Sequence, residues 1–236
     1  MASELSKDFD FQISKGMLRR FLKKLGYTWK RFRKSLKSKQ DPIEYEKKLS
    51  ELKQLLELYH SNYIDLFFGD ASGFNLEGYV PYGWQPKREY IKVTPSKTKG
   101  TQIFGLMSLK NELESYSCKG SMNSEVVIAY LDDFKKNIKK RTIIVLDNAS
   151  IHKSKKFLSK VEQWKQDDLY IWFLPKYSPH LNPIEILWRM MKYNWIPYER
   201  IMTQNELDKI IEEILLNFGS EYTINFKEHK VTNIFN

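Results

Sequence analysis

The sequence predicts a mixed α/β fold, in which a sheet is covered by helices and preceded by a short basic helical segment. Strand-like and helix-like patterns alternate from residue 63 onward, as expected for such a sheet. The segment "TIIVL" at 142–146 contains an unbroken apolar run, which is typical of a central strand buried on both faces. The chain has 236 residues and is 42% hydrophobic, which is enough for one substantial domain with a real core.

The N-terminal segment is strongly basic. Residues 1–40 hold twelve Lys and Arg against three acids, whereas the other residues of this chain of net charge +10 are nearly balanced. Such a block predicts a polyanionic partner, with nucleic acid first and an anionic membrane second, although a solvated basic helix is the ordinary alternative. The DNA contacts we expect are Arg19, Arg20, Lys23, Lys24, Lys30, Arg31, Arg33 and Lys34, with Lys97 and Lys99 in a later loop.

Two helices are expected before the sheet. Apolar residues at helical spacing predict the first over 14–25, with Ser14 as N-cap and Gly26 just past the end. Its basic amphipathic pattern is compatible with the recognition helix of a helix-turn-helix, for which a single helix is a weak signal. Asp41-Pro42 marks a break before a helix over 43–60. We therefore expect four parts: a DNA-binding segment at 1–40, a linker helix at 41–60, an α/β domain at 61–220 and a C-terminal tail at 221–236.

The body alternates between strands and helices. A capping-box-like start precedes the last helix, and Asn182 with Pro183 is expected to cap the one before it. The expected strands are 63–70, 88–93, 101–109, 142–146 and 169–175. The expected helices are 124–138, 154–166, 182–195 and 203–218.

Several classes of protein are disfavoured by composition. The chain has one cysteine, Cys118, so it forms no intramolecular disulfide. Its start lacks the pattern of a secretory signal, and no apolar run approaches the roughly 18 residues of a membrane span. We expect a soluble cytoplasmic protein with no membrane partner.

Three acids form the candidate site. Asp70 and Asp147 each follow an expected strand, and Glu185 lies in the first turn of an expected helix. The carboxyl ends of central strands open onto the ligand crevice of an α/β sheet, so neighbouring strands would bring the two aspartates together. Carboxylates that close repel one another unless a cation intervenes, and Mg²⁺ prefers oxygen ligands. Two such ions can activate water and stabilise the leaving oxygen of a phosphodiester.

Each acid also has an ordinary interpretation. Asp147 at a strand end can start the next helix, which for an isolated aspartate is the more common case. Glu185 can pair with Arg189 on an exposed helix face. Asp70 has the weakest alternative, because no strong helix start follows it. His152, like Asn148, is interpreted as a neighbour of the site that contacts phosphate or water, although such a histidine is more often polar or capping.

Three blocks of sequence occur in an order that resembles a known family. They are "GDASGFNLEGYVPYGWQPK", "IIVLDNASIHKSKKF" and "LPKYSPHLNPIEILWRMMK", spread over roughly residues 60–200. The chain resembles the catalytic core of DDE transposases, closest to the mariner-related bacterial insertion-sequence group, with the basic segment similar to the end of that group's helix-turn-helix region. Relatives have a fuller N-terminal region and an acid after the first aspartate, where this chain has Ala71.

The resemblance implies a ribonuclease H-like fold and assigns the metal-binding, catalytic triad to Asp70, Asp147 and Glu185. It implies cleavage of transposon ends and strand transfer into target DNA, dependent on Mg²⁺ or its substitute Mn²⁺, with two ions. The partners implied are double-stranded DNA and a second copy of the chain, with no small-molecule substrate, and the place of action is the nucleoid. Two alternatives stay open: a non-catalytic or domesticated DNA-binding relative, and another nuclease on the same fold.

Overall fold

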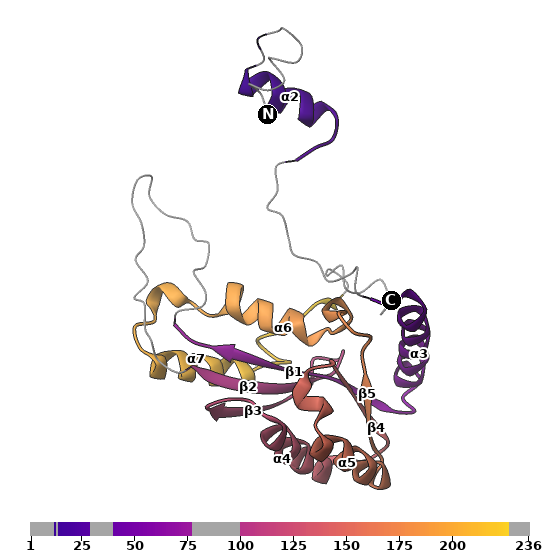
Figure 1. Ribbon diagram of the computed structural model, residues 1–236. Helices are drawn as coiled ribbons and strands as arrows, with labels where there is room; N and C mark the ends of the chain where they lie inside the picture. Colours follow the sequence, from indigo (N-terminus) through magenta and orange to yellow (C-terminus); the bar gives the residue numbers. More distant parts are fainter. Residues whose placement is uncertain (1–11, 13, 29–39, 77–99, 227–236) are drawn as a thin grey trace. The chain divides into compact units, whose positions relative to one another are not determined.

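The computed structural model describes residue 12 and residues 14–28, 40–76 and 100–226, which fall into two units (Figure 1). The first unit spans Met1–Leu36 and the second spans Lys37–Asn236. Helix α3 (Pro42–His60), expected as a linker, falls in the second unit, where Leu52, Leu56 and Tyr59 enter the core. Within the described ranges, no helix combines the length and the apolar character that crossing a bilayer requires.

The first unit is described through one basic helix. Helix α2 runs over Lys15–Lys24, and the Ser14 side chain accepts the Met17 N–H at its start, as expected from the sequence. Gly26 takes a left-handed conformation (φ 79°) directly after the helix. No residue of α2 is buried, and the apolar side chains of Phe21 and of Leu25, which follows the helix, are exposed.

A five-stranded mixed sheet forms the centre of the second unit (Figure 1). Its strands are β1 (Asp65–Phe74), β2 (Thr101–Met107), β3 (Leu113–Lys119), β4 (Thr142–Leu146) and β5 (Leu169–Phe173). The order across the sheet is β3-β2-β1-β4-β5. The pairs β1–β2 and β2–β3 are antiparallel, whereas β1–β4 and β4–β5 are parallel. Strand β1, which contains Asp70, and strand β4, which ends one residue before Asp147, are therefore neighbours that run in the same direction.

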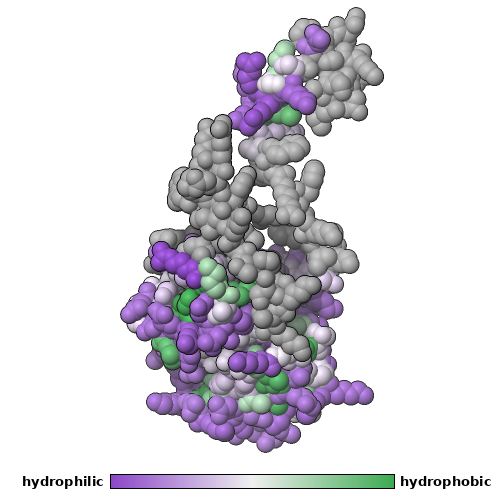
Figure 2. All heavy atoms as spheres, turned by 90° about the vertical axis from the view of Figure 1, so that its left-hand side faces the viewer, coloured by the Kyte–Doolittle hydropathy of each residue, from purple (hydrophilic) through white to green (hydrophobic). Residues whose placement is uncertain are grey.

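Helices cover both faces of the sheet (Figure 1). On one face, α4 (Ser124–Phe134) and α5 (Lys155–Trp164) pack with side chains such as Phe104 and Ile144. On the other face, α3, α6 (Ile184–Met190) and α7 (Gln204–Leu216) pack with side chains such as Leu66 and Phe68. Figure 2 shows a largely hydrophilic outer surface on its side of the molecule, with apolar residues in small groups. Burying apolar surface on both faces is the main stabilising contribution to this fold.

The strand predicted to end at Asp70 continues further, which corrects the sequence analysis. Its pairing with β4 stops at Phe68↔Val145, but its pairing with β2 continues to Phe74↔Thr101. Gly69 lies within the strand, paired with Leu106 of β2, and a Cβ at this position would approach the Leu146 side chain to 2.6 Å. Asp70 is thus held inside a strand, at the point where β1 separates from β4.

The third strand of the antiparallel part also differs from expectation. Strand β3 was not predicted, because its sequence "LESYSCK" is half polar, as an edge strand with one exposed face allows. The strand expected over 88–93 lies outside the described residues. Shorter bounds than predicted also apply to α4 and α5, each of which ends in a 3-10 turn.

Two helix starts settle the capping predictions. Helix α7 begins with the expected capping box, in which Thr203 and Glu206 satisfy each other's backbone N–H groups. The side chain of Asn182, expected as the N-cap before α6, makes no capping hydrogen bond there, so this prediction was wrong. After α6 the chain continues as a π-helical turn over Met191–Trp195. Beyond α7, Ile224 is buried against the core, and residues 227–236 lie outside the described part.

Candidate active site

Asp70 is positioned by strand β1 and by helix α6. It pairs with Gly105 across the antiparallel ladder, one residue after the buried Gly69. The Trp188 indole Nε1–H donates to Asp70 Oδ2 at 3.1 Å. This contact links the strand to the helix that carries Glu185. Residue 105 has to be glycine, because an added Cβ would lie 2.9 Å from the Trp188 ring and 3.1 Å from Ile184.

Asp147 follows directly after β4, and its side chain is fixed by two donors. Its Oδ1 accepts the Ala149 N–H at 2.9 Å and faces His152 Nδ1 at 3.1 Å. It therefore forms a local turn and does not cap the following helix, because Ser154 caps α5 by accepting the Phe157 N–H. The capping alternative for Asp147 is excluded by this arrangement, and half of its side chain stays accessible to solvent.

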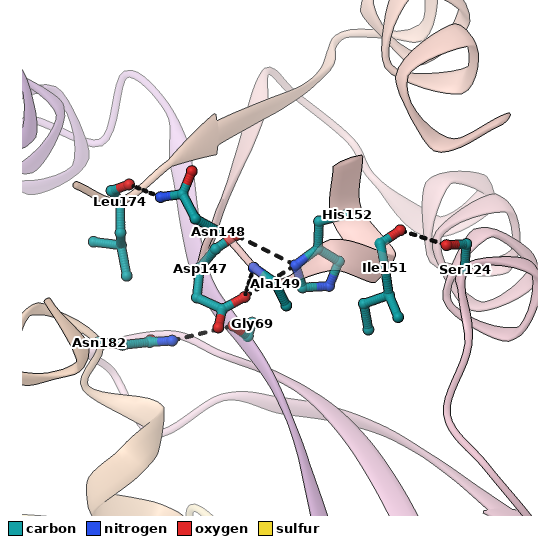
Figure 3. Close-up of polar contacts among 9 residues, drawn as sticks. All are labelled: Gly69, Ser124, Asp147, Asn148, Ala149, Ile151, His152, Leu174 and Asn182. Atoms are coloured by element: carbon teal, nitrogen blue, oxygen red, sulfur yellow. Dashed lines mark hydrogen bonds and ion pairs between the residues drawn. The ribbon is translucent and has the colours of Figure 1, made fainter. Parts of the chain in front are cut away.

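His152 and Asn148 hold this turn in place through hydrogen bonds (Figure 3). His152 is buried and packs against the Phe157 ring. Its Nδ1 faces two acceptors, Oδ1 and the backbone oxygen of Asp147, so this nitrogen carries the hydrogen. Asn148 donates its amide to the Leu174 carbonyl, which ties the turn to the end of β5. Both residues act on the position of Asp147 from within the protein, and His152 is too buried to bind a phosphate directly.

Glu185 lies in the first turn of α6, as expected from the sequence. Its side chain reaches solvent at the margin of the buried face formed by Ile184, Leu187 and Trp188. Its electrostatic neighbours include Asp147 and Lys192. The Lys192 ammonium group donates to Ser72 Oγ at 2.6 Å, two residues beyond Asp70 in β1. Glu185 thus belongs to the same charged cluster as the two aspartates.

The pKa values of Asp70 and Glu185 are raised, in part by neighbouring carboxylates, whereas that of Asp147 is lowered. Burial, and then the charge of Glu185, raises the pKa of Asp70 to about 7, against a weaker lowering by the Ala71 N–H. Burial also raises the pKa of Glu185, with opposing contributions from Lys192 and Asp147. Burial of Asp147 acts in the same direction, but its hydrogen bonds from His152 and Ala149 outweigh it and hold that pKa below the ordinary value. Such mutual repulsion is typical of carboxylates arranged around a cation.

The donor set fits a hard divalent cation. Within the described ranges, no three His, Cys, Asp or Glu side chains already stand close enough to share one ion. Mg²⁺ does not need such a protein cage, since it usually binds one or two carboxylates together with waters and substrate phosphates. Three coupled carboxylates, with Asp70 destabilised as an anion, provide the oxygen ligands and negative charge that this ion requires.

The predicted DNA-binding residues are only partly described. Arg19, Arg20, Lys23 and Lys24 are exposed on α2. The other six lie outside the described residues: Lys30, Arg31, Arg33, Lys34, Lys97 and Lys99. Of the lysines in the body of the protein, Lys156 pairs with Glu125 at 2.6 Å and Lys176 is exposed.

Sequence reasoning missed three residues beside the acids. Trp188 was assigned to the apolar stripe of its helix, yet its indole N–H contacts Asp70. Asn182 was assigned to a cap, yet its amide donates to the Gly69 carbonyl at 3.2 Å. Lys192 was not singled out. A buried tryptophan usually finds an acceptor for its N–H, so the "NPIEILW" spacing did contain a usable signal for Trp188.

The fold and the site define a class: a ribonuclease H-like domain with acidic residues grouped beside the central strands β1 and β4. The family model described as "DDE superfamily endonuclease" matches residues 65–208. That match includes all three acids and more than half of the chain. The chain belongs to the DDE superfamily endonucleases.

Comparisons with individual proteins agree with this assignment. The chain is 26% identical over 198 residues to the insertion element IS630 uncharacterized 39 kDa protein of Shigella sonnei. This alignment covers 81% of the chain but 55% of that relative, so the chain spans about half the length of the relative. The fold is similar to the mariner Mos1 paired-end complexes with Mn and with Mg, at TM-scores of 0.63 and 0.62 and 15% identity. Each covers 91% of this chain and 66% of the Mos1 chain.

Proposed function

We propose that this chain is the catalytic part of a DNA transposase, which cleaves the ends of an insertion element and joins them to target DNA. The observation that carries the proposal is the placement of Asp70 in β1, of Asp147 directly after the neighbouring strand β4 and of Glu185 in the first turn of α6, with both other acids raising the pKa of Asp70. Family membership and the relative named for an insertion element support the choice of substrate. The Mos1 complexes support DNA and Mg or Mn as ligands.

In this proposal the three acids hold one or two divalent ions, Mg²⁺ or its substitute Mn²⁺, with two as the expected number. Bound ions of this kind supply a nucleophile at neutral pH and stabilise the charge on the scissile phosphate. Asp147 presents its Oδ2, because Oδ1 is held by Ala149 and His152. Asp70 is oriented by the Trp188 indole, and Lys192 adds a positive charge beside Glu185.

We further propose that the basic segment at 1–40 contacts DNA phosphates, with Arg19, Arg20, Lys23 and Lys24 among the contacts on α2. Bringing two element ends together requires two active sites, so the working form on DNA is a homodimer. Its place of action is then the nucleoid of the cell.

A cleavage assay on labelled element-end DNA tests this function. Wild-type protein and the Asp147→Asn variant are incubated with the DNA and Mg²⁺ or Mn²⁺, and cleavage and DNA binding are measured separately. We expect cleavage by the wild type only, with binding by both proteins, because the substitution removes a metal ligand and leaves the basic segment intact. Binding by both without cleavage by either would favour the alternative of a non-catalytic DNA-binding relative.

A further inference from the structure

Asn182 lies three residues before Glu185 and is almost fully buried, with 2% of its surface exposed. Its backbone carbonyl accepts the Glu185 N–H at 3.2 Å, as the residue at a helix start does. Its side chain does not follow that pattern, since no side-chain cap is formed at α6. The amide Nδ2 instead donates to the Gly69 carbonyl of β1 at 3.2 Å (Figure 3).

The accepting carbonyl occupies a special place in the sheet. The parallel ladder between β1 and β4 ends at Phe68↔Val145, so Gly69 is the first residue of β1 beyond it. A buried backbone carbonyl there needs a new donor once the neighbouring strand has departed. The Asn182 amide supplies that donor directly before Asp70. It therefore joins the backbone of the strand that carries one acid to the start of the helix that carries another.

Stability alone does not account for an asparagine at this position. Its Oδ1 is buried and has no hydrogen-bond partner among the described residues. A buried polar atom without a partner is unfavourable, and this offsets much of the stability that the hydrogen bond to Gly69 contributes. An apolar side chain of the same shape would avoid that cost but would leave the Gly69 carbonyl without its donor. The benefit that remains is geometric, since the hydrogen bond sets the spacing between the Asp70 backbone and the first turn of α6.

We propose that Asn182 is a positioning residue, which holds the start of α6 against β1 so that the Glu185 and Asp70 carboxylates converge on the same divalent ion. This inference rests on the proposed function of the three acids. Trp188 makes a second connection between α6 and β1, but it contacts the Asp70 carboxylate itself. The Asn182 side chain donates its hydrogen bond to a backbone carbonyl and not to a carboxylate, so its replacement leaves the donors to Asp70 and Asp147 described above in place.

Substitution of Asn182 separates a positioning role from a structural one. Asn182→Leu keeps the shape and removes the donor, and Asn182→Ala removes both. Val127→Ala is the matched control, because Val127 is equally buried but lies in α4 on the other face of the sheet. Thermal melting is measured for each protein, together with Mn²⁺ binding by electron paramagnetic resonance and single-turnover cleavage of the element-end DNA.

We expect Asn182→Leu to melt below the wild type, because the buried Gly69 carbonyl loses its donor, but to remain folded at the assay temperature. We expect the folded variant to bind Mn²⁺ and cleave DNA about 10- to 100-fold less well, the usual loss when a residue that orients metal ligands is removed. Val127→Ala should melt lower and retain Mn²⁺ affinity. Mn²⁺ affinity of Asn182→Leu within threefold of the wild type would overturn the inference. The inference would also be overturned if Val127→Ala lost as much Mn²⁺ affinity as Asn182→Leu, or if neither Asn182 variant folded. If the wild type itself bound no Mn²⁺, the proposed function would fail first.

Discussion

Asp70 combines a buried position with two negative neighbours, and this makes its ionisation unfavourable for the folded state. Its folded-state pKa is raised to about 7 from an ordinary value of 3.8. The folded protein therefore binds more protons than the unfolded chain between these values, so stability without metal falls as pH rises through this range. The carboxyl group that we propose as a metal ligand thus weakens the metal-free fold at neutral pH.

Chemical denaturation without divalent ions at pH 5.5 and pH 8 measures this cost. The wild type should lose about 1 to 2 kcal/mol of unfolding free energy over that interval, allowing for partial solvent access to the Asp70 carboxyl group. Asp70→Asn should show a flatter pH dependence and higher stability at pH 8. If the two proteins lost stability in parallel, the raised pKa of Asp70 would be wrong.

His152 provides a second prediction at the scale of a residue. Its Nδ1 anchors Asp147 Oδ1 at 3.1 Å, and an asparagine amide at position 152 can place a nitrogen near the same point. We expect His152→Asn to keep most Mn²⁺ affinity and His152→Leu to lose about tenfold or more. Titration with Mn²⁺ at matched folded fractions makes the comparison. Equal affinities in these two variants would show that the hydrogen bond does not matter.

At the scale of elements, the position of α6 depends on a glycine in β2. A Cβ at Gly105 would come within 3.1 Å of both Trp188 and Ile184, so the helix would have to move away from the sheet. We expect Gly105→Ala to lower the unfolding free energy by about 1 to 3 kcal/mol and to slow cleavage. Gly16→Ala in α2 is the control, since an added Cβ there meets no atom closer than 3.8 Å. Unchanged stability of Gly105→Ala would contradict the packing of α6 described above.

A comparison of the predicted and observed elements shows which of them local sequence patterns were sufficient to predict. The apolar run of β4 and the capping signals of α2 and α7 were sufficient to predict these elements. Strand β3 was missed because an edge strand needs little apolar sequence, and the extension of β1 past Asp70 depends on pairing with β2, which is not encoded locally. The cap assigned to Asn182 failed for a similar reason, since its partner Gly69 is 113 residues away in the chain.

For the site, the sequence indicated which acids to examine but not how they are held. Taken alone, Asp147 fitted a helix cap as well as a ligand, and only together with Asp70 and Glu185 did the sequence favour the ligand. The structure shows Ser154 capping α5 and Ala149 bonded to Asp147, while the role of Asp147 as a metal ligand stays a prediction. The supporting contacts of His152 and Trp188 join distant parts of the chain, so local periodicity could not reveal them.

At the scale of the whole molecule, the distribution of charge predicts a strong dependence of DNA binding on salt. The basic residues are concentrated before residue 40, and four of them are exposed on α2. Affinity should fall linearly on a double logarithmic plot against salt concentration, because phosphate contacts release bound cations. Replacing Arg19, Arg20, Lys23 and Lys24 by alanine should reduce the slope by about 3 to 4. A slope unchanged by these replacements would place the phosphate contacts elsewhere.

The central claim is that Asp147 holds a divalent ion during phosphodiester cleavage, and replacement by a softer ligand tests it most directly. A thiolate binds Mn²⁺ better than Mg²⁺, which prefers oxygen. Asp65→Cys is the control, since Asp65 is the first residue of β1, away from Asp70, and pairs with Lys140. Cleavage of element-end DNA is measured for both variants in each metal. We predict that Asp147→Cys is inactive in Mg²⁺ and recovers activity in Mn²⁺, while Asp65→Cys cleaves like the wild type in both. Full activity of Asp147→Cys in Mg²⁺ would contradict the claim.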